Sequence, residues 1–568
     1  MQSETRQCKR CKENFTLEPD DFSFYEKMKV PVPGICPTCR FKMRAVFRNE
    51  RTLYKRTCGL CNRSIITMYS PNSPYTVYCN DCFISDKWDP YSYAIDYDPS
   101  KPFSEQLKEL TIKVPKSATY SSTYVGPNIN SEYCNFAGGN KDCYLIFNSG
   151  PGNENCAYSR GIIWSRDVFD IYYGDKIENC NECINTHNSN GIILGQNISD
   201  CIDSRFVLNC SGCTNCFGSV NLRHKSYHFF NKPLSRDEWL KRVSAISGSY
   251  EKTEEMKQKF SEFSLKFPRR ENNNLKITNC FGDYIFESKN CYQCFEVSFG
   301  EDMRYSFSVK RGKDCADMIG HCRSSELLYN GVGVGAGSRN VICSWWVESS
   351  QDVAYSFATR QSQNCFGCDG IKNGSFVILN KKYSKEEYQK VKNDIIEELK
   401  SKDVYGDFFP AELAFFAYNE TIGQDNKPLT REQALAEGFR WEDEIQKTEG
   451  KETLKAEDIP DHIKDVEDSI LDEVLSCIKC FRNYRLIRRE LEFYRKMLIP
   501  IPRKCWNCRF TDRITRRGPY KFWNRACAKC QKEITTNYPP ERADGSSVRA
   551  GSPEPIVYCE KCYQQEVY

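Results

Sequence analysis

Between about residues 134 and 380 the chain has a short hydrophobic period instead of long amphipathic runs. Units in which Asn or Asp precedes a small apolar residue recur there, mostly at steps of 12 or 13 residues. Such a period is typical of a β-solenoid, in which each coil stacks on its neighbours to bury its apolar side. We expect the apolar residue to form an inward ladder, with Asn or Asp at the adjoining turn. These residues are Cys143, Cys156, Val168, Cys180, Cys291, Met303, Cys315, Val341, Val353 and Cys365.

Two helical segments interrupt this pattern at an offset of 149 residues. Ser235 and Ser384 are predicted N-caps, and a Glu three residues after each Ser completes a capping box. The apolar residues that follow fall on one helical face. Each helix is therefore predicted to close one half of the solenoid, whose exposed end needs a cover. The apolar residues are Trp239, Val243, Ile246, Tyr388, Val391, Ile395 and Leu399.

The two ends of the chain carry a second duplication. Each end has four CxxC pairs, and the first three pairs of one end match those of the other at a constant offset of 469 residues. FYEKMKVPVPGICPTCRF aligns with FYRKMLIPIPRKCWNCRF without a gap. The repeat indicates that one module occurs twice.

A CxxC pair presents two thiolates to one ion, and two pairs complete a tetrahedral zinc site. Four pairs at each end therefore predict two zinc ions per end and about four Zn²⁺ per chain. We expect the first pair to join the second and the third to join the fourth; a cross-braced pairing of first with third is the alternative. The predicted ligands are Cys8, Cys11, Cys36, Cys39, Cys58, Cys61, Cys79, Cys82, Cys477, Cys480, Cys505, Cys508, Cys527, Cys530, Cys559 and Cys562.

The stretch from Cys8 to Arg40, with Phe15, Phe24, Tyr25, Pro33 and CPTCR, resembles zinc-ribbon modules of the treble-clef type. Modules of this kind occur in largely uncharacterised proteins from bacterial candidate phyla and large viruses. Cys477 to Arg509, with Glu490, Phe493, Tyr494 and CWNCR, is similar to the same pattern. The resemblance implies zinc and a fold, and it implies no activity.

Together these patterns predict a mixed, mainly β fold, in which zinc modules flank a β-solenoid-like middle in two halves, each closed by a hairpin and a helix. Residues 447–461 are charged and lack apolar periodicity, so we expect a flexible boundary there. The predicted segments are 1–85, the N-terminal double zinc module; 86–133, a connector; 134–265, the first solenoid half; 266–446, the second half with a packed extension; 447–475, a linker and helix; and 476–568, the C-terminal double zinc module.

The cysteines of the middle region also include CxxC pairs, and these admit two interpretations. CxxCxxC begins some iron–sulfur motifs. Here the fourth ligand is not where that motif places it, and the pairs keep phase with the solenoid repeat. We therefore expect buried core thiols. The residues concerned are Cys180, Cys183, Cys210, Cys213, Cys216, Cys291, Cys294, Cys365 and Cys368.

The composition predicts the cellular compartment of the protein and the redox state of its cysteines. The N-terminus is polar, and no run of about 18 apolar residues occurs among the 568, which predicts a cytoplasmic protein without membrane spans. We do not expect the thirty-three cysteines to form a disulfide framework, because a reducing compartment keeps thiols free and an odd count leaves one cysteine unpaired.

The formal net charge is only +4, yet the charge is unevenly distributed. Residues 1–61 carry a net +6 and residues 470–530 a net +11, which leaves −13 elsewhere. In a treble clef the second CxxC opens a helix, so arginines after Cys508 are expected on one face. Arginines interleaved with aromatics suit RNA or single-stranded nucleic acid. The candidate residues are Arg488, Arg489, Trp506, Arg509, Arg513, Arg516, Arg517 and Trp523.

These arginines also admit structural roles that involve no nucleic acid. Arg40 and Arg509 directly follow the second CxxC in each copy and are candidates to donate to the thiolates. The other arginines are candidates for a solvated face.

The leading hypothesis is a non-enzymatic zinc protein that binds nucleic acid through its basic C-terminal module. The first alternative is a protein-interaction scaffold, since solenoids commonly present such surfaces. The second is a solenoid enzyme that acts on carbohydrate through scattered carboxylates, although no HExxH, GxSxG, Walker loop or dinucleotide fingerprint occurs.

Overall fold

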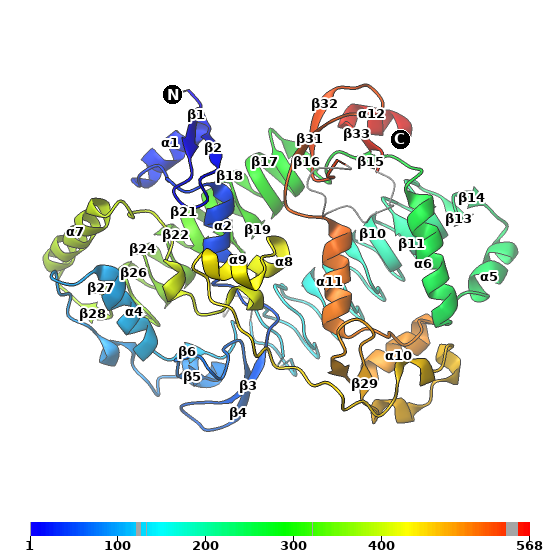
Figure 1. Cartoon of the computed structure of the whole chain (residues 1–568), viewed down its shortest axis with the longest axis horizontal. Helices are drawn as coiled ribbons and strands as arrows, with labels where there is room; N and C mark the ends of the chain where they lie inside the picture. The colour runs from blue at the N-terminus through cyan, green and yellow to red at the C-terminus, as the bar shows by residue number, and fades with distance from the viewer. Residues whose placement is uncertain (1, 121–125, 132, 321, 541–554, 568) are drawn as a thin grey trace. The chain divides into compact units, whose positions relative to one another are not determined.

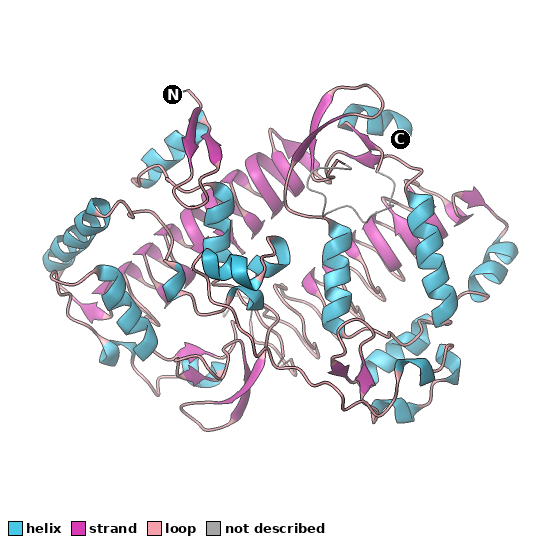
Figure 2. Ribbon diagram, viewed as in Figure 1, coloured by secondary structure: helices cyan, strands magenta, loops and turns pink. Residues whose placement is uncertain are grey.

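A computed structural model of the chain describes residues 2–120, 126–131, 133–320, 322–540 and 555–567. The chain forms two compact units, and each consists of two separate stretches of sequence. Unit 1 comprises residues 1–119 and 273–445, and unit 2 comprises 120–272 and 446–568. The mainly β class is confirmed, and short strands make up most of the regular structure (Figure 2).

Unit 1 contains the N-terminal cysteine module and the second half of the repeat region (Figure 1). Its helices are α1 (Pro19–Met28), α2 (Pro37–Ala45), α3 (Asn80–Ile84), α4 (Phe103–Lys113), α7 (Lys385–Ser401), α8 (Ile422–Asn426) and α9 (Arg431–Ala436). The strands outside the repeat are β1 (Glu4–Gln7), β2 (Asn14–Leu17), β3 (Tyr54–Thr57), β4 (Ser64–Thr67), β5 (Val77–Tyr78) and β6 (Lys116–Ser117). Those of the repeat are β16 (Leu275–Thr278), β17 (Phe281–Ser298), β18 (Glu301–Arg304), β19 (Phe307–Lys310), β20 (Gly312–Ile319), β21 (Ser325–Val332), β22 (Arg339–Ile342), β23 (Trp345–Glu348), β24 (Gln351–Ala354), β25 (Phe357–Arg360), β26 (Gln363–Phe366), β27 (Ser375–Ile378) and β28 (Lys381–Lys382).

Unit 2 contains the first half of the repeat region and the C-terminal cysteine module. Its helices are α5 (Arg236–Ser244), α6 (Tyr250–Ser264), α10 (Arg488–Met497), α11 (Trp506–Arg517) and α12 (Glu560–Val567). The strands of the repeat are β7 (Arg160–Ile163), β8 (Tyr172–Asp175), β9 (Ile184–His187), β10 (Ile193–Ser199), β11 (Arg205–Leu208), β12 (Thr214–Val220), β13 (Ser226–Phe229) and β14 (Lys232–Pro233). The others are β15 (Arg269–Arg270), β29 (Leu475–Ser476), β30 (Asn483–Tyr484), β31 (Trp523–Ala526), β32 (Glu533–Thr536) and β33 (Val557–Tyr558).

The repeat regions are stacks of parallel coils: the first stack spans 129–233 in unit 2, and the second spans 275–382 in unit 1. In the first stack Ile184 pairs with Gln196 and Arg205 with Phe217, in each case a register step of 12 residues. In the second stack some steps are 13 residues. The period seen in the sequence is therefore the register step between neighbouring coils.

The chain of each stack turns at every third residue. From Asn155 to Phe230, every third residue has a positive φ. Twelve residues with a turn every three give each coil four corners, so each coil has four sides. Only Gly, and to a lesser degree Asn and Asp, adopts positive φ at little cost. This accounts for the Asn or Asp that precedes many of the inward residues; other corners carry larger side chains, such as Tyr158, Trp164 and Leu194.

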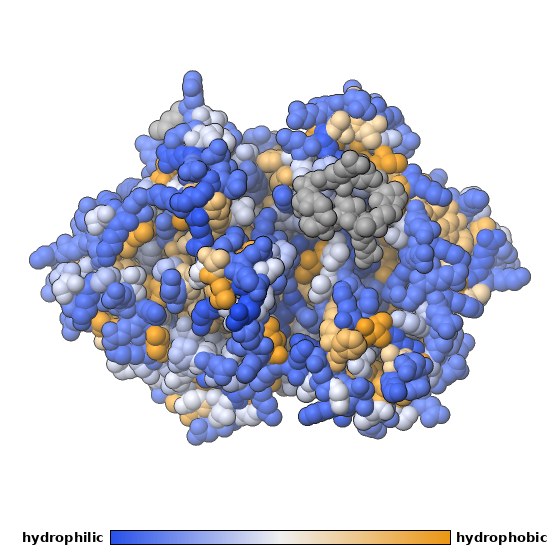
Figure 3. All heavy atoms as spheres, viewed as in Figure 1, coloured by the Kyte–Doolittle hydropathy of each residue, from blue (hydrophilic) through white to orange (hydrophobic). Residues whose placement is uncertain are grey.

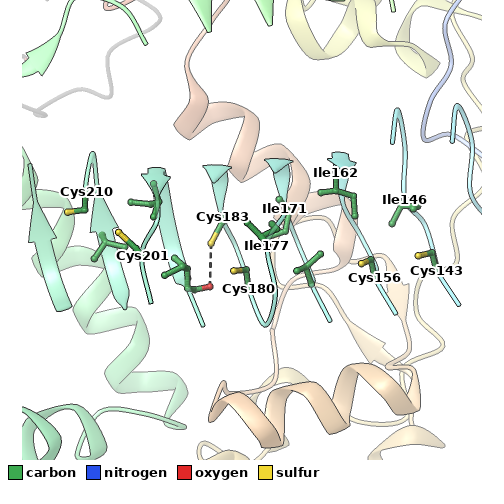
Figure 4. Packing of buried hydrophobic residues seen from close by; sticks show 14 of the residues in the cluster. Cys143, Ile146, Cys156, Ile162, Ile171, Ile177, Cys180, Cys183, Cys201 and Cys210 are labelled. Atoms are coloured by element: carbon green, nitrogen blue, oxygen red, sulfur yellow. Dashed lines mark hydrogen bonds between the residues drawn. The ribbon is translucent and has the colours of Figure 1, made fainter. Parts of the chain in front are cut away.

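The residue after each corner points into the coil. Most of these residues are small or β-branched and almost fully buried, and the apolar ones form a column through the first stack. Figure 4 shows cysteines and isoleucines of this column on successive coils of the first stack, among them Cys156, Ile162, Cys180 and Cys183. An equivalent column of cysteines, valines and methionines fills the second stack. The predicted inward ladder is thus the core of both stacks.

The corner geometry makes a prediction at Asn364, whose φ is 52°. Asn364→Ala is expected to lower the free energy of unfolding by about 1–2 kcal/mol, because a Cβ-bearing residue other than Asn is strained at positive φ. Asn364→Gly is the matched control and is expected to stay within about 0.5 kcal/mol of wild type. Urea denaturation measures both variants, and equal losses for Ala and Gly would contradict the corner interpretation.

The predicted capping helices are present. Ser384 and Glu387 form a capping box at the start of α7, and Ser235 accepts a hydrogen bond from the backbone N–H of Glu238 at the start of α5. Tyr388 of α7 and Trp239 of α5 are both buried. Each helix follows an antiparallel hairpin that ends its stack, β27–β28 or β13–β14.

The linker and helix expected at 447–475 are not found. Three short 3₁₀ turns occupy this segment, at Ala456–Asp458, Ile463–Asp465 and Asp468–Leu471. Pro460 lies between the first two turns and lacks the N–H that a continuing helix needs. The segment also has partners outside it, since Ile463 N–H donates to Gly248 O at 2.9 Å.

The face shown in Figure 3 is mostly hydrophilic, with scattered apolar patches. None of the helices in the described ranges is long and apolar enough to cross a bilayer. The assignment of the terminal modules to the zinc-ribbon or treble-clef fold, and of the stacks to the β-solenoid fold, stays a prediction.

Candidate metal centres

The sixteen terminal cysteines gather into four groups of four. In each group the four sulfur atoms lie within 4.8 Å of one another. The groups follow the expected sequential pairing: the first CxxC of each module joins the second, and the third joins the fourth. We call these groups site 1 (Cys8, Cys11, Cys36, Cys39), site 2 (Cys58, Cys61, Cys79, Cys82), site 3 (Cys477, Cys480, Cys505, Cys508) and site 4 (Cys527, Cys530, Cys559, Cys562).

The sulfur spacing fits a tetrahedral ion. Four sulfurs each about 2.3 Å from a central Zn²⁺ are separated by about 3.8 Å. Cys11 Sγ lies 3.7 Å from Cys36 Sγ, and Cys61 Sγ lies 3.9 Å from Cys79 Sγ. The corresponding distances in sites 3 and 4 are both 3.7 Å. All four groups could therefore hold a metal ion with four protein ligands.

Local backbone structure places the ligands. In site 1 the first CxxC follows strand β1 of a hairpin, and Cys36 is the N-cap of α2. Cys505 is likewise the N-cap of α11 in site 3. Backbone N–H groups then point at sulfur: Cys36 N–H donates to Cys8 Sγ at 3.2 Å, and Cys79 N–H donates to Cys58 Sγ at the same distance. Donors of this kind favour thiolates over thiols.

Site 2 has an additional cationic partner that sequence reasoning missed. Arg63 donates to Cys61 Sγ at 3.4 Å and to Cys79 Sγ at 3.3 Å. The hydrogen bond from Arg63 lowers the pKa of Cys61 to about 6. The aligned residue in the C-terminal copy is Lys532. The sequence feature that could have predicted this contact is the basic residue two positions after Cys61 and after the aligned Cys530.

The arginine helix of unit 2 is α11, and three of its predicted nucleic-acid residues are buried. Arg509, Arg513 and Arg517 are 5%, 1% and 4% exposed. Arg509 Nε lies 2.9 Å from Asp170 Oδ2, and Arg513 Nη1 lies 2.7 Å from Asp170 Oδ1. The Asp170 carboxylate therefore holds two guanidinium groups. Asp170 occupies a corner of the first stack, where its φ is 61°.

Further contacts fix α11 on this corner. Arg513 donates to Tyr158 O at 3.0 Å, and Arg517 donates to the Tyr172 hydroxyl at 2.5 Å. Phe510 packs against Tyr172 and Ile184 on the stack. Arg509 and Arg513 thus share the corner at Asp170, and Arg513 also reaches Tyr158, one register step of 12 residues earlier.

Electrostatics at this contact are strong because water is excluded. Burial acts to lower the pKa of Arg509, but the negative charge of Asp170 raises it well above its ordinary value. Burial raises the pKa of Glu490, against the opposing effect of Arg509. Glu490 accepts hydrogen bonds from the hydroxyls of Tyr158 and Tyr494. The network thus joins α10, α11 and the stack.

Unit 1 contains the same arrangement on its own residues. Arg40 Nε lies 2.9 Å from Asp317 Oδ2, and Arg44 Nη2 lies 2.9 Å from Asp317 Oδ1. Asp21, which aligns with Glu490, accepts a hydrogen bond from the hydroxyl of Tyr305 at 2.8 Å. Asp317 and Tyr305 follow Asp170 and Tyr158 by 147 residues. We call each arrangement, the helix arginines with their corner aspartate, a clamp.

The other predicted nucleic-acid residues are more accessible but also have partners. Arg488 is exposed, and it pairs with Asp468 at 3.1 Å. Arg516 is exposed, and it donates to Glu182 O at 2.8 Å. The remaining three are partly buried: Arg489 donates to Asp142 O, the ring of Trp506 lies 6.0 Å from that of Phe147, and Lys521 lies over Trp523.

The expectation that Arg509, Arg513 and Arg517 form an exposed basic face is therefore wrong. Their helical spacing was read correctly, but the face they share is turned toward the stack. The donation of Arg40 and Arg509 to thiolates is not found either, within the described residues. Their guanidinium groups donate to Ile35 O and Lys504 O, the carbonyls directly before the second CxxC.

The middle cysteines belong to the core. Among the described residues they form no group of three or more sulfurs close enough for one ion. Cys183 Sγ donates to Asn181 O at 3.2 Å and to Ile192 O at 3.4 Å. Burial raises the pKa of Cys156, Cys180 and Cys210 well above the ordinary thiol value. Protonated thiols are thus expected at these three positions.

Cys213 provides a test of this assignment because it lies in the CxxCxxC run. Cys213→Ala is expected to leave four metal ions per chain, since the thiol is a small apolar group of the core. The cost in unfolding free energy is expected to be about 1 kcal/mol. Native mass spectrometry measures the metal count, with Cys508→Ala as the control that loses one ion. A count of three for the Cys213 variant would make this cysteine a ligand.

Neither a protein-family model nor a curated protein sequence matches this chain. The function must therefore be argued from the sites and the clamps themselves.

Proposed function

We propose that the protein is a non-catalytic scaffold in which four structural zinc ions hold the terminal modules in shape. The observation that carries this proposal is the closed ligand set: each site has four cysteines within one ligand sphere. Catalytic zinc sites keep a position open for water or substrate, and structural sites do not. Four thiolates in tetrahedral spacing suit zinc or iron. Zinc adds no redox chemistry and fits a structural role.

The stacks are proposed as β-solenoid-like rods that present a surface to a protein partner. One outer ladder of the second stack alternates in charge along the rod, and neighbouring members pair. Lys313 lies 3.4 Å from Glu301, and Arg339 lies 2.7 Å from Glu326. A surface whose charges cancel locally does not attract a polyanion over a distance. This charge pattern therefore favours a protein partner over nucleic acid.

Nucleic-acid binding through α11 loses its main support, because three of the four helix arginines are buried in the clamp. The hypothesis retains a specific test at Arg488 and Arg516, the exposed members of the predicted set. Fluorescence anisotropy with single-stranded RNA at low and high salt is expected to show no affinity that depends on these two residues. A loss of salt-dependent RNA affinity in R488A/R516A would instead favour nucleic acid.

The zinc proposal is tested by elemental analysis together with native mass spectrometry of the full chain. About four zinc ions per chain are expected. Two or fewer ions would overturn the paired-site assignment. Iron in their place would show as thiolate-to-metal absorption in the visible range and would replace zinc in the proposal.

A further inference from the structure

Arg509 connects site 3 to the first stack. Its guanidinium group donates to Lys504 O at 3.0 Å, and Lys504 directly precedes the ligand Cys505. The same group lies 2.9 Å from Asp170 Oδ2 and 3.3 Å from Glu490 Oε1. One side chain thus bonds the loop that shapes the metal site, the corner of the stack and helix α10.

Site 1 is connected in the same way in unit 1. Arg40 donates to Ile35 O at 2.6 Å, directly before the ligand Cys36, and lies 2.9 Å from Asp317. Cys36 and Cys39 sit at the start of the helix that also carries Arg44 of the clamp. The position of the clamp arginines therefore depends on the geometry of the metal loop in both units.

Sites 2 and 4 attach to their units by a different contact. In unit 1, β5 of the site 2 module pairs in parallel with β6, and Lys116 N–H donates to Thr76 O at 2.8 Å. In unit 2, β33 of the site 4 module pairs in parallel with β15. These contacts use backbone groups and involve neither clamp arginines nor corner aspartates. The two sites of each module are thus coupled to different parts of the unit.

We propose that metal occupancy of sites 1 and 3 controls the docking of the clamp helices, whereas sites 2 and 4 do not. This inference rests on the proposed function, because it requires metal in the four sites. With metal bound, the loops before Cys36 and Cys505 are fixed, and Arg40 and Arg509 each keep their carbonyl acceptor. Without metal, four cysteines lose their common ligand and the loop opens. The buried guanidinium groups then lose a partner in a place that water does not reach, which favours undocking.

Undocking would change the surface of unit 2 in a defined way. The α11 face that carries Arg509, Arg513 and Arg517 would leave the Asp170 corner and enter solvent. Amides of α11 and of the coil around Asp170 would then exchange faster, since protection reports the local opening free energy. Amides in the interior of β11 and β12 form an internal reference, because no candidate metal group lies in the described part of the stack.

The test uses the full chain with two matched double variants. C477S/C480S removes two ligands of site 3 without altering α11, and C527S/C530S does the same in site 4. Native mass spectrometry is expected to show three metal ions in each. Hydrogen exchange with mass spectrometry is expected to show α11 exchanging about tenfold faster or more in the site 3 variant and at the wild-type rate in the site 4 variant.

Each alternative outcome is decisive. Equal α11 protection in both variants, with one metal lost from each, overturns the coupling but leaves the scaffold proposal standing. Faster exchange in β11 and β12 as well as α11 overturns it too, because the effect is then global. Wild-type protein without metal overturns the proposed function itself. If C477S/C480S does not fold, stepwise metal release from wild type by a mercurial thiol reagent replaces it, and α11 that stays protected after complete release contradicts the inference.

Discussion

Arg513→Ala is expected to lower the free energy of unfolding of unit 2 by about 3–5 kcal/mol, because it removes one of the two cations paired with the buried Asp170 carboxylate and leaves a cavity where a fully buried side chain stood. Arg513 is 1% exposed, so water cannot replace the lost contact. The variant also loses the hydrogen bond to Tyr158 O. Chemical denaturation with the intrinsic aromatic signal measures the change.

Arg516→Ala is the matched control. Arg516 lies three positions further along the same helix but is exposed, and a surface substitution of this kind usually changes stability by no more than about 0.5 kcal/mol. Metal content should be unchanged in both variants. A stable Arg513 variant with reduced RNA affinity would reverse the argument and restore the sequence-based hypothesis. Arg44→Ala in unit 1 is expected to behave like Arg513→Ala.

Metal removal is expected to have the second large effect on the stability of the protein. Structural zinc contributes about 10–16 kcal/mol in small zinc domains at neutral pH, and without metal the four cysteines of each site lose their common ligand. A strong chelator is therefore expected to unfold the terminal modules and to lower the melting temperature of both units. Calorimetry with and without chelator measures the shift, and added zinc should reverse it.

The effect should depend on pH with a defined sign. Each ligand must be a thiolate, so protons compete with the metal and affinity falls as pH decreases. Metal release by a fixed chelator concentration is therefore expected to be more complete at pH 5.5 than at pH 8. Equal release at both pH values would indicate that the cysteines are not the ligands.

The metal sites were predictable because their signal is local. A CxxC pair brings two ligands together within one turn of chain. The same pairs recur at the other end of the chain at an offset of 469 residues, which indicates that both ends pair their cysteines in the same way. The stack period was predictable for a similar reason: Asn or Asp suits a positive φ, and the next residue is forced inward. Both signals depend on neighbours only a few residues away.

The clamps were not predictable from the same kind of signal. The helical spacing of Arg509, Arg513 and Arg517 is visible in the sequence, but the partner Asp170 is 339 residues from Arg509. In the sequence Asp170 resembles many other corner acids of the stack. The closest available hint was a second Asp three residues after the first in both RDVFD and KDCAD. Whether an arginine faces solvent or an aspartate is decided by tertiary structure.

The order of the segments along the chain has a consequence for synthesis. Arg40 and its corner partner Asp317 are 277 residues apart, and at 5–20 residues per second the ribosome needs roughly 15–55 s to bridge that distance. The N-terminal module therefore leaves the ribosome long before its docking surface exists. The first stack, in turn, is complete while Asp170 still awaits the arginines of α11. Neither unit can finish folding as it emerges, and during that interval a basic helix and an acidic corner remain open to chaperones.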